Sequence, residues 1–448
     1  MRIVRFAALS GAALALFLVP SQARAGVSSH PMQPPPVFRS VRGTIQRPDM
    51  RDASGGKIQH VVYILQENRS FNNLFMGFPG ALTQNYGYDT NGTKIPLHSQ
   101  TIATSWDIDH SANGFFAAYD NGKIDGWNNE YACCGQPANF AYAYAPRKET
   151  RTYWDMAKQY VLADHNFQSN LDGSFIAHQY AIAAYANSEV NFPSGDWGCQ
   201  GGDNDQVQTL TQNRTYGPNV PVCENYETLG DELDAASIPW RFYTYPYDRD
   251  GGLWNAYSAV EHIYKGPDYT NDVITPANYF INDVSDGNMA AVSWITPLYE
   301  NSDHSGFNST GGPSWVASLV NAVGESKYWD STAIFIIWDD WGGFFDPVVP
   351  VYEDYDGLGF RVPLIAISAY AKQGYVSHVQ YESSSVLKFM EDTFGLAPLA
   401  ASDTRAADPS SDFFDFSQTP RTYKPFVGKF DVRYDPNAPH VHAPVPGD

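Results

Sequence analysis

The stretch His60-Val-Val-Tyr-Ile-Leu-Gln-Glu-Asn-Arg-Ser-Phe-Asn-Asn-Leu-Phe75 decides the fold of this chain. Residues 61–65 form a continuous run of β-branched, aromatic and aliphatic side chains, which is typical of a strand buried on both faces of a parallel sheet. The polar residues 66–70 follow directly. Glu67 and Asn68 therefore stand at the carboxyl end of the strand, where open α/β sheets place their ligand sites. The alternative is a loop in which these side chains only meet solvent and cap the next helix.

A second stretch repeats this pattern near the other end of the chain. Residues 333–338 are apolar, and Asp339 and Asp340 follow them. Two adjacent carboxylates repel each other in a partly desolvated site, so either their pKa values rise or a cation balances them. A metal ion is the simpler solution, and an exposed acidic turn is the alternative. Gly342 and Gly343 let the chain turn sharply behind the pair.

Short strand patterns alternate with helical patterns along residues 57–400. This alternation predicts an α/β fold with a mainly parallel central sheet, helices on both faces and long loop insertions such as residues 77–131. Asp303 and His304 follow a predicted strand at residues 290–295. A third strand end therefore presents polar groups.

Residues 175–185 predict a buried helix with Ser174 at its N-terminus. Free backbone N–H groups and the positive end of the helix dipole suit a bound phosphate there, while the Ser174 hydroxyl attacks phosphorus. The alternative is that Ser174 only caps the helix, which is worth about 1 kcal/mol. His178 comes one turn later, so it either faces the same site or braces the helix.

His110 lies in the long loop close to Asp107 and Asp109. Neighbouring carboxylates favour the imidazolium and raise the pKa of a histidine, which suits a proton donor or a phosphate-binding cation. An exposed loop histidine is the alternative. The spacing of apolar residues then predicts a helix over residues 152–163.

Together these segments resemble the bacterial phosphoesterase family that contains the phosphatidylcholine-type phospholipases C and a related acid phosphatase, within the alkaline-phosphatase superfamily. The motifs Q-E-N-R-S-F (66–71) and W-D-D-W-G-G-F-F-D (338–346) carry the resemblance. Further matching segments follow in the family's order at residues 168–178, 301–304, 312–316, 359–364 and 384–395. The resemblance implies an alkaline-phosphatase-like fold and a hydrolase that acts on phosphate esters, either small molecules or phospholipids.

The residues expected to hold one divalent metal ion are all oxygen donors: Glu67, Asn68, Ser174, Asp339 and Asp340. Oxygen ligands without a thiolate favour a hard cation such as Ca²⁺, Mg²⁺ or Mn²⁺. The resemblance to the acid phosphatase implies a single ion.

The resemblance also implies that Ser174 is the nucleophile and forms a phosphoseryl intermediate. His110 and His304 are the candidates to protonate the leaving group or to contact phosphate oxygens. His178 and Asp303 are candidates for substrate binding. Asp172 departs from the family pattern, which usually has a glycine at that position.

Two functions from different classes remain open. The first is a phosphoesterase, of either the phospholipase C or the acid phosphatase type, since both need the same catalytic centre. The second is a non-catalytic exported protein on the same scaffold that binds a glycan or a lipid and uses the metal structurally. The intact set of ligands and nucleophile favours the enzyme.

The N-terminus is typical of a secretory signal peptide over residues 1–25, with a basic start, an apolar run and an A-x-A pattern. The apolar run is too short to span a bilayer comfortably, and no later segment approaches the required length of about 20 residues. We expect an exported protein, periplasmic or extracellular, that is not embedded in the membrane. The remaining segments are expected to be an extended arm at 26–56, the catalytic domain at 57–400, and a C-terminal tail at 401–448 that packs over the surface or frays.

The formal net charge of −21 argues against a nucleic-acid partner, because little positive charge is available to neutralise a phosphate backbone. Export permits disulfides. Cys199 and Cys223 flank a Gly- and Asp-rich excursion and are expected to form a bridge. For the adjacent Cys133 and Cys134, a strained vicinal bridge, two thiols and partners elsewhere all stay open. No Cys/His spacing typical of zinc is present in the sequence.

Overall fold

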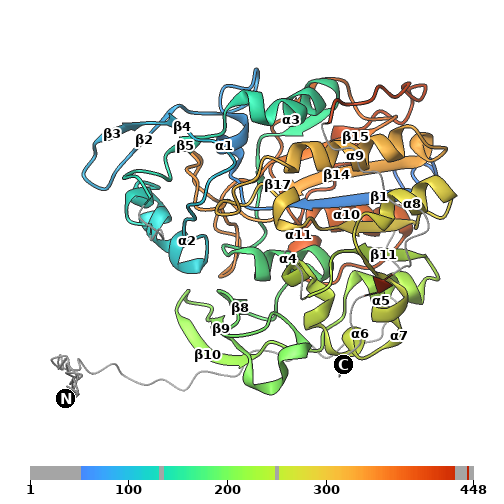
Figure 1. Cartoon of the computed structure of the whole chain (residues 1–448), viewed down its shortest axis with the longest axis horizontal. Coiled ribbons are helices and arrows are strands. Elements are labelled where there is room, and N and C mark those ends of the chain that lie inside the picture. The colour runs from blue at the N-terminus through green and yellow to red at the C-terminus, as the bar shows by residue number, and fades with distance from the viewer. Residues whose placement is uncertain (1–51, 131–135, 248–251, 429–440, 443–448) are drawn as a thin grey trace, which may run out of the picture. The chain divides into compact units, whose positions relative to one another are not determined.

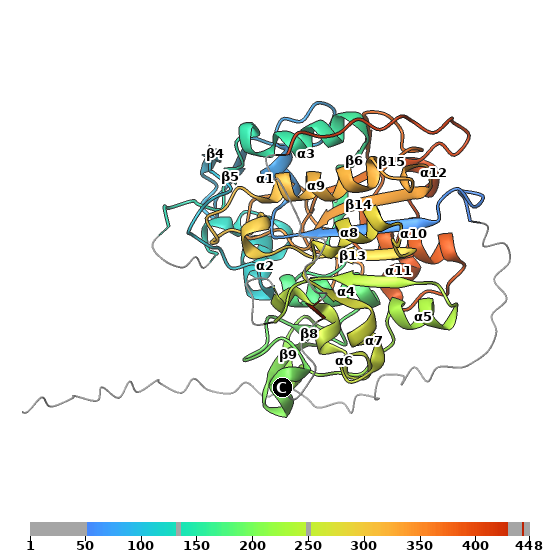
Figure 2. The same ribbon diagram turned by 45° about the vertical axis from the view of Figure 1, so that its right-hand side comes forward.

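The apolar run that opens the deciding stretch forms strand β1 (His60–Gln66). The protein is described by a computed structural model that covers residues 52–130, 136–247, 252–428 and 441–442. β1 pairs in parallel with β14 (Thr332–Trp338) on one side and with β13 (Val292–Ile295) on the other (Figures 1 and 2). The register aligns Gln66 with Trp338. The residues that follow, Glu67 and Asp339, therefore leave the sheet side by side.

The central sheet has nine strands within the described residues, in the order β16-β6-β15-β14-β1-β13-β11-β12-β18. β15 and β18 run against their neighbours, and the other seven strands share one direction. The strands not yet bounded are β6 (Val161–Ala163), β11 (Trp240–Tyr243), β12 (Val273–Thr275), β15 (Leu364–Ser368), β16 (Tyr375–Ser377) and β18 (Val441–His442). The expected α/β fold with a mainly parallel sheet is confirmed.

Helices cover both faces of this sheet (Figures 1 and 2). One face carries α3 (Arg147–Gln159) and α9 (Gly312–Gly324), with α8 (Tyr279–Asp286) packed against α9. The other face carries α4 (Ser174–Ala183), α5 (Leu229–Ala235) and α10 (Ser385–Phe394). The shorter helices are α1 (Phe71–Phe75), α2 (Ala112–Tyr119), α6 (Glu261–Tyr264), α7 (Pro267–Asn271), α11 (Ala401–Arg405) and α12 (Ser410–Phe413).

Small sheets lie outside the central one. β8 (Glu189–Val190), β9 (Gln206–Leu210) and β10 (Tyr216–Pro221) form a three-stranded antiparallel sheet. The two-stranded pairs are β2 (Tyr86–Tyr88) with β3 (Lys94–Pro96), β4 (His98–Ser99) with β5 (Ala143–Tyr144), and β7 (Asn166–Phe167) with β17 (Tyr381–Glu382). The expected bridge between Cys199 and Cys223 is confirmed, with an S–S distance of 2.03 Å. Cys133 and Cys134 lie outside the described residues.

The helix predicted over residues 152–163 is wrong at its C-terminal end. α3 stops at Gln159, and residues 161–163 form β6 between β15 and β16. A three-residue apolar run fits either a helix or a buried strand, and here pairing with two neighbouring strands decides. The long loop at 77–131 contains α2, which the sequence pattern did not reveal.

The described residues include only part of the N-terminal and C-terminal segments. The expected signal peptide at 1–25 and most of the expected arm lie outside the described residues. Within the segment expected to be a surface tail, Phe413 and Phe414 are buried in the main core. In the described part of the chain, none of the helices has the length and apolar character needed to cross a bilayer.

A buried ion pair joins the segment after β14 to the start of α1. Arg361 and Asp346 are both fully buried, and the guanidinium donates from Nε at 2.8 Å and from Nη2 at 3.0 Å to the two carboxylate oxygens. Asp346 also accepts the Asn72 N–H, and the Arg361 carbonyl accepts the Phe71 N–H. The pair therefore holds together the two segments that carry Glu67 and Asp339.

Replacing Arg361 with Met should lower the free energy of unfolding by about 3–5 kcal/mol, because the substitution leaves the Asp346 carboxylate buried without its partner. Denaturant unfolding measures the change. Lys123→Met is the matched control, since it removes a cation from an exposed pair with Asp120. Its midpoint should stay close to that of the wild type. Equal effects of the two substitutions would contradict the role of the buried pair.

Candidate active site

The structure brings together the five residues expected to hold a metal, although they come from three separate parts of the chain. The Ser174 hydroxyl lies 3.2 Å from a carboxylate oxygen of Glu67 and 3.2 Å from one of Asp340. The Asn68 amide donates to Ser174 Oγ at 2.9 Å and to Asp340 Oδ2 at 2.5 Å. The Asn68 backbone N–H donates to Asp339 Oδ1 at 3.0 Å. All five residues are buried.

A close backbone contact sets the position of Asn68. This residue has φ 51°, a left-handed conformation that asparagine tolerates better than most residues. Gly342 also has a positive φ, and a Cβ atom at Gly342 would lie 2.0 Å from the Asn68 carbonyl oxygen. The Gly342 N–H donates to Asp340 Oδ1 at 2.7 Å. Glycine is therefore required at 342 to let the two strand exits approach each other.

Ser174 is the first residue of α4, and the capping position belongs to Gly173. The Ser174 side chain is therefore not used as a cap and points to the carboxylates instead. Asp172 accepts the backbone N–H groups of Ala112, Gly173 and Asn191. Asp172 thus fixes the turn before Ser174 against α2, and burial raises its pKa to about 6.

The carboxylates of this cluster are held in an unfavourable environment. Burial, together with the charge of Asp339, raises the pKa of both Glu67 and Asp340 well above the usual value. Asn68 Oδ1 and Asp339 Oδ2 are buried without a hydrogen-bond partner in the described structure. A cation among these oxygen atoms would balance the charge and use both unpaired acceptors, so the donor set fits a hard divalent ion.

His178 adds a nitrogen to this cluster. Its Nε2 lies 2.9 Å from Glu67 Oε1 and 3.7 Å from Asp339 Oδ2, and the ligand atoms of the three residues lie within 4.8 Å of one another. Burial lowers the pKa of His178 to about 4, so the imidazole is neutral near pH 7. The spacing of one turn after Ser174 indicated that it could face the site. The sequence did not show that His178 would contact Glu67 and Asp339, two of the expected metal ligands.

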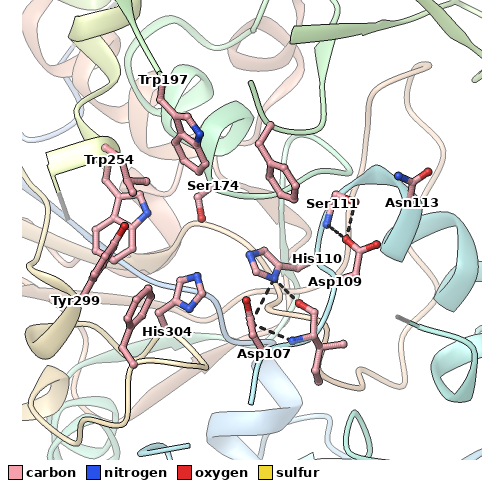
Figure 3. A pocket seen from close by; sticks show the side chains of 14 residues that line it. Asp107, Asp109, His110, Ser111, Asn113, Ser174, Trp197, Trp254, Tyr299 and His304 are labelled. Carbon is pink, nitrogen blue, oxygen red and sulfur yellow. Dashed lines mark hydrogen bonds and ion pairs between the residues drawn. The ribbon is translucent and has the colours of Figure 1, made fainter. Parts of the chain in front are cut away.

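A cavity of about 520 Å³ opens beside Ser174 (Figure 3). Ser174, His110 and His304 face it together, and the two imidazole rings lie 5.4 Å apart between centroids. Aromatic rings form much of its wall: Phe192, Trp197, Trp254, Tyr299 and Phe307. The sequence pattern did not predict this wall, because its rings come from separate loops and have no common spacing.

His110 and His304 present the same ring nitrogen but differ in charge. Nδ1 of His110 contacts the backbone carbonyl of Ile108, and Nδ1 of His304 contacts that of Ser305. A carbonyl oxygen can only accept a hydrogen bond, so Nδ1 carries the hydrogen in each ring and Nε2 is the nitrogen that can serve the cavity. Burial opposes protonation of both. The carboxylates of Asp340 and Asp107 nevertheless raise the pKa of His110 to about 9, whereas burial lowers the pKa of His304. Near pH 7 His110 is therefore a donor and His304 an acceptor.

Asp303 lies behind the cavity. It accepts hydrogen bonds from the Tyr153 hydroxyl at 2.8 Å and the Trp338 indole at 3.0 Å, and burial raises its pKa to about 6. Fourteen described residues line the cavity, and neither Asp303 nor His178 is one of them. The Gln66 side chain accepts the backbone N–H of Asp303, so the β1 exit holds the segment that carries His304.

Comparison with known proteins identifies the family. The model of the Phosphoesterase family matches residues 58–397. The hemolytic phospholipase C of Pseudomonas aeruginosa is 26% identical, over 84% of this chain and 58% of that protein. Phospholipase C B of Mycobacterium tuberculosis is 24% identical, over 82% of this chain and 80% of that protein.

Among solved structures, a protein of the alkaline phosphatase superfamily from Vibrio parahaemolyticus matches with a TM-score of 0.40 and 12% identity, over 79% of this chain and 71% of that chain. The expected assignment to a hydrolase of phosphate esters is supported by the family match and by the phospholipase C relatives. Because the family model covers most of the sequence, this chain belongs to the Phosphoesterase family.

Proposed function

We propose that this chain is an exported, metal-dependent phosphoesterase that acts through Ser174. The observation that carries the proposal is the position of the Ser174 hydroxyl, which contacts two buried carboxylates and faces an open cavity. The phospholipase C relatives support an ester of phosphate as the substrate.

The residues proposed to hold one hard divalent ion are Glu67, Asn68, Ser174, Asp339 and Asp340, with His178 beside them. When bound, such an ion acidifies the serine hydroxyl and neutralises charge on a phosphate oxygen. The chain itself supplies the orientation. The Asn68 amide fixes Ser174 Oγ at the N-terminus of α4, where the helix dipole favours an anion.

The reaction then proceeds in two displacements. Ser174 Oγ passes its proton to the Glu67 carboxylate that it contacts and forms a bond to phosphorus as the bond to the leaving alcohol breaks. His110 donates its Nε2 proton to that alcohol. In the second displacement, water attacks phosphorus and gives a proton to His304 as the bond from phosphorus to Ser174 Oγ breaks. The Glu67 carboxyl returns a proton to Ser174 Oγ, and phosphate or a phosphorylated head group is released. The aromatic wall excludes water from one side of the cavity and provides an apolar surface for the rest of the substrate.

Export is supported by two observations. The N-terminal sequence has the features of a signal peptide, and the Cys199–Cys223 bridge is of a kind that persists in oxidising compartments.

Adding Ca²⁺, Mg²⁺ or Mn²⁺ to chelator-treated protein should raise its melting temperature, because the ion removes the repulsion among the buried carboxylates. An ion at about 100 times its Kd adds about 2.7 kcal/mol. Scanning calorimetry measures the effect, which should shrink as the pH falls because protons compete for the same oxygens. Asp340→Asn should weaken it, whereas Asp286→Asn, at an exposed position, should not. A melting temperature that none of the three ions changes would exclude a metal at this cluster.

Ser174→Ala should lower turnover of chromogenic phosphate mono- and diesters by at least about 10³-fold, since it removes the nucleophile. The matched control is Ser111→Ala, at another serine of the cavity, whose hydroxyl binds Asp109 instead of the cluster. It should retain at least a tenth of the activity. Acid quenching followed by mass spectrometry should detect phosphate on Ser174 alone. A Ser174→Ala enzyme within tenfold of the wild type would refute the assignment.

His110→Gln should slow esters of poor leaving groups more than esters of 4-nitrophenol, because only a basic leaving alcohol needs a proton. Steady-state rates over a series of leaving groups give the comparison. His98→Gln is the control, at a histidine that does not line the cavity. If His110→Gln slowed all esters by the same factor, His110 would bind phosphate oxygens instead of protonating the leaving group.

A further inference from the structure

A second group of metal-binding side chains, Asp164, His165 and His378, lies apart from Ser174, and their ligand atoms are within 4.8 Å of one another. Asp164 follows β6 and His378 follows β16. These strands pair in parallel with Ala163 opposite Ser377, and the Asp164 N–H donates to the Ser377 carbonyl at 3.0 Å. Strand pairing thus joins residues 214 positions apart in the sequence.

Both imidazoles point at the same carboxylate. Nδ1 of His165 lies 2.7 Å from Asp164 Oδ1, and Nδ1 of His378 lies 2.9 Å from the same oxygen. Asp164 is fully buried, and its Oδ2 accepts the Leu82 N–H at 2.7 Å. The carboxylate is therefore fixed by backbone on one side and meets two ring nitrogens on the other.

The donor atoms differ from those near Ser174. Two imidazole nitrogens with one carboxylate oxygen are typical ligands of Zn²⁺ and related transition ions, whereas an oxygen-rich set suits hard cations. His165 and His378 are 28% and 61% exposed, so an ion has access from solvent and water can complete a four-coordinate shell. We propose that Asp164, His165 and His378 form a site for a divalent transition-metal ion of the Zn²⁺ type.

Metal binding at this site would replace the two hydrogen bonds between the imidazole rings and Asp164. In the hydrogen-bonded state each imidazole donates its Nδ1 hydrogen to the carboxylate, which can only accept. An ion takes the place of these hydrogens. Each hydrogen moves through solvent from Nδ1 to Nε2 of the same ring, so Nδ1 gains a free lone pair for the ion and the ring stays neutral.

The position of the site indicates that a bound ion would link separate segments of the chain. β6 and β14 run in the same direction with β15 between them, so the two clusters lie at the same edge of the sheet. The Asp164 carboxylate accepts the N–H of Leu82, in the segment after α1. The backbone carbonyl of Asp164 accepts a hydrogen bond from Arg361 Nη1 at 2.6 Å. An ion here would tie the ends of β6 and β16 to this segment. The site is independent of the proposed phosphoesterase activity.

The test uses the mature chain after chelation, with excess Mg²⁺ or Ca²⁺ to occupy the cluster at Ser174. Titration calorimetry with Zn²⁺, and elemental analysis after dialysis, should give one ion per chain. His378→Ala should weaken that binding by at least about 100-fold, because one of three protein ligands is lost. Zn²⁺ should raise the melting temperature of the wild type and not that of the variant.

His262→Ala is the matched control, because His262 also pairs with an aspartate, at 2.7 Å from Asp231, but without a second histidine. It should bind Zn²⁺ as the wild type does. His378→Ala replaces an exposed side chain, and its melting temperature without metal shows whether it folds. Asp339→Asn should keep the Zn²⁺ stoichiometry, which separates this site from the cluster at Ser174. Zn²⁺ binding that is absent from the wild type, or unchanged in His378→Ala, would overturn the proposal.

Discussion

The structure depends on the close approach of negatively charged side chains at the end of two paired strands. The register of β1 and β14 places Gln66 beside Trp338, so the next residues, Glu67 and Asp339, must leave the sheet together. Charge repulsion in this buried space is partly offset by hydrogen bonds from Asn68 and Ser174. Protons or a cation must supply the rest. The fold tolerates this arrangement because the surrounding segments are held by other contacts.

Those contacts form a frame around the site. Gln66 accepts the N–H of Asp303, and Arg361 joins the segment after β14 to α1. Gly342 allows the left-handed turn at Asn68. None of these residues lines the cavity beside Ser174. Each nevertheless limits where the ligand oxygens and the two cavity histidines can be, so the site is preorganised by the packing of backbone segments instead of by loops that adjust.

The sequence predicted the parts of this arrangement that follow from local pattern. An apolar run followed by carboxylates indicates a strand end, and parallel strands bring such ends to one edge, so the pattern alone was enough to place Glu67 near Asp340. The helix that starts at Ser174 was predictable from its apolar residues for the same reason. The contacts of His178 with Glu67 and Asp339 and the aromatic wall of the cavity were not predictable, because they depend on how α4 and several loops pack around the strand ends.

Strand β6, which the sequence analysis assigned to a helix, shows most clearly what sequence spacing cannot predict. Residues 161–163 continue the apolar spacing of α3, and only pairing with β15 and β16 makes them a strand. With β6 taken as helix, nothing indicates that Asp164 would meet His378. The second group of metal-binding side chains was therefore invisible to reasoning from sequence spacing, although each of its residues is plain in the sequence.

The overall charge of the chain favours a local cation in the proposed chemistry. A protein with a formal charge of −21 repels an anionic ester, and any ionised carboxylate beside Ser174 adds to that repulsion at the reacting atom. Of the groups described at the cavity, the protonated His110 and the N-terminus of α4 oppose it. One imidazolium and a helix dipole, which is equivalent to roughly half a charge, do not balance a phosphate and three carboxylates in their ionised form. In the proposed chemistry a divalent ion would supply the remaining positive charge, so substrate binding and metal binding should be coupled in the same place.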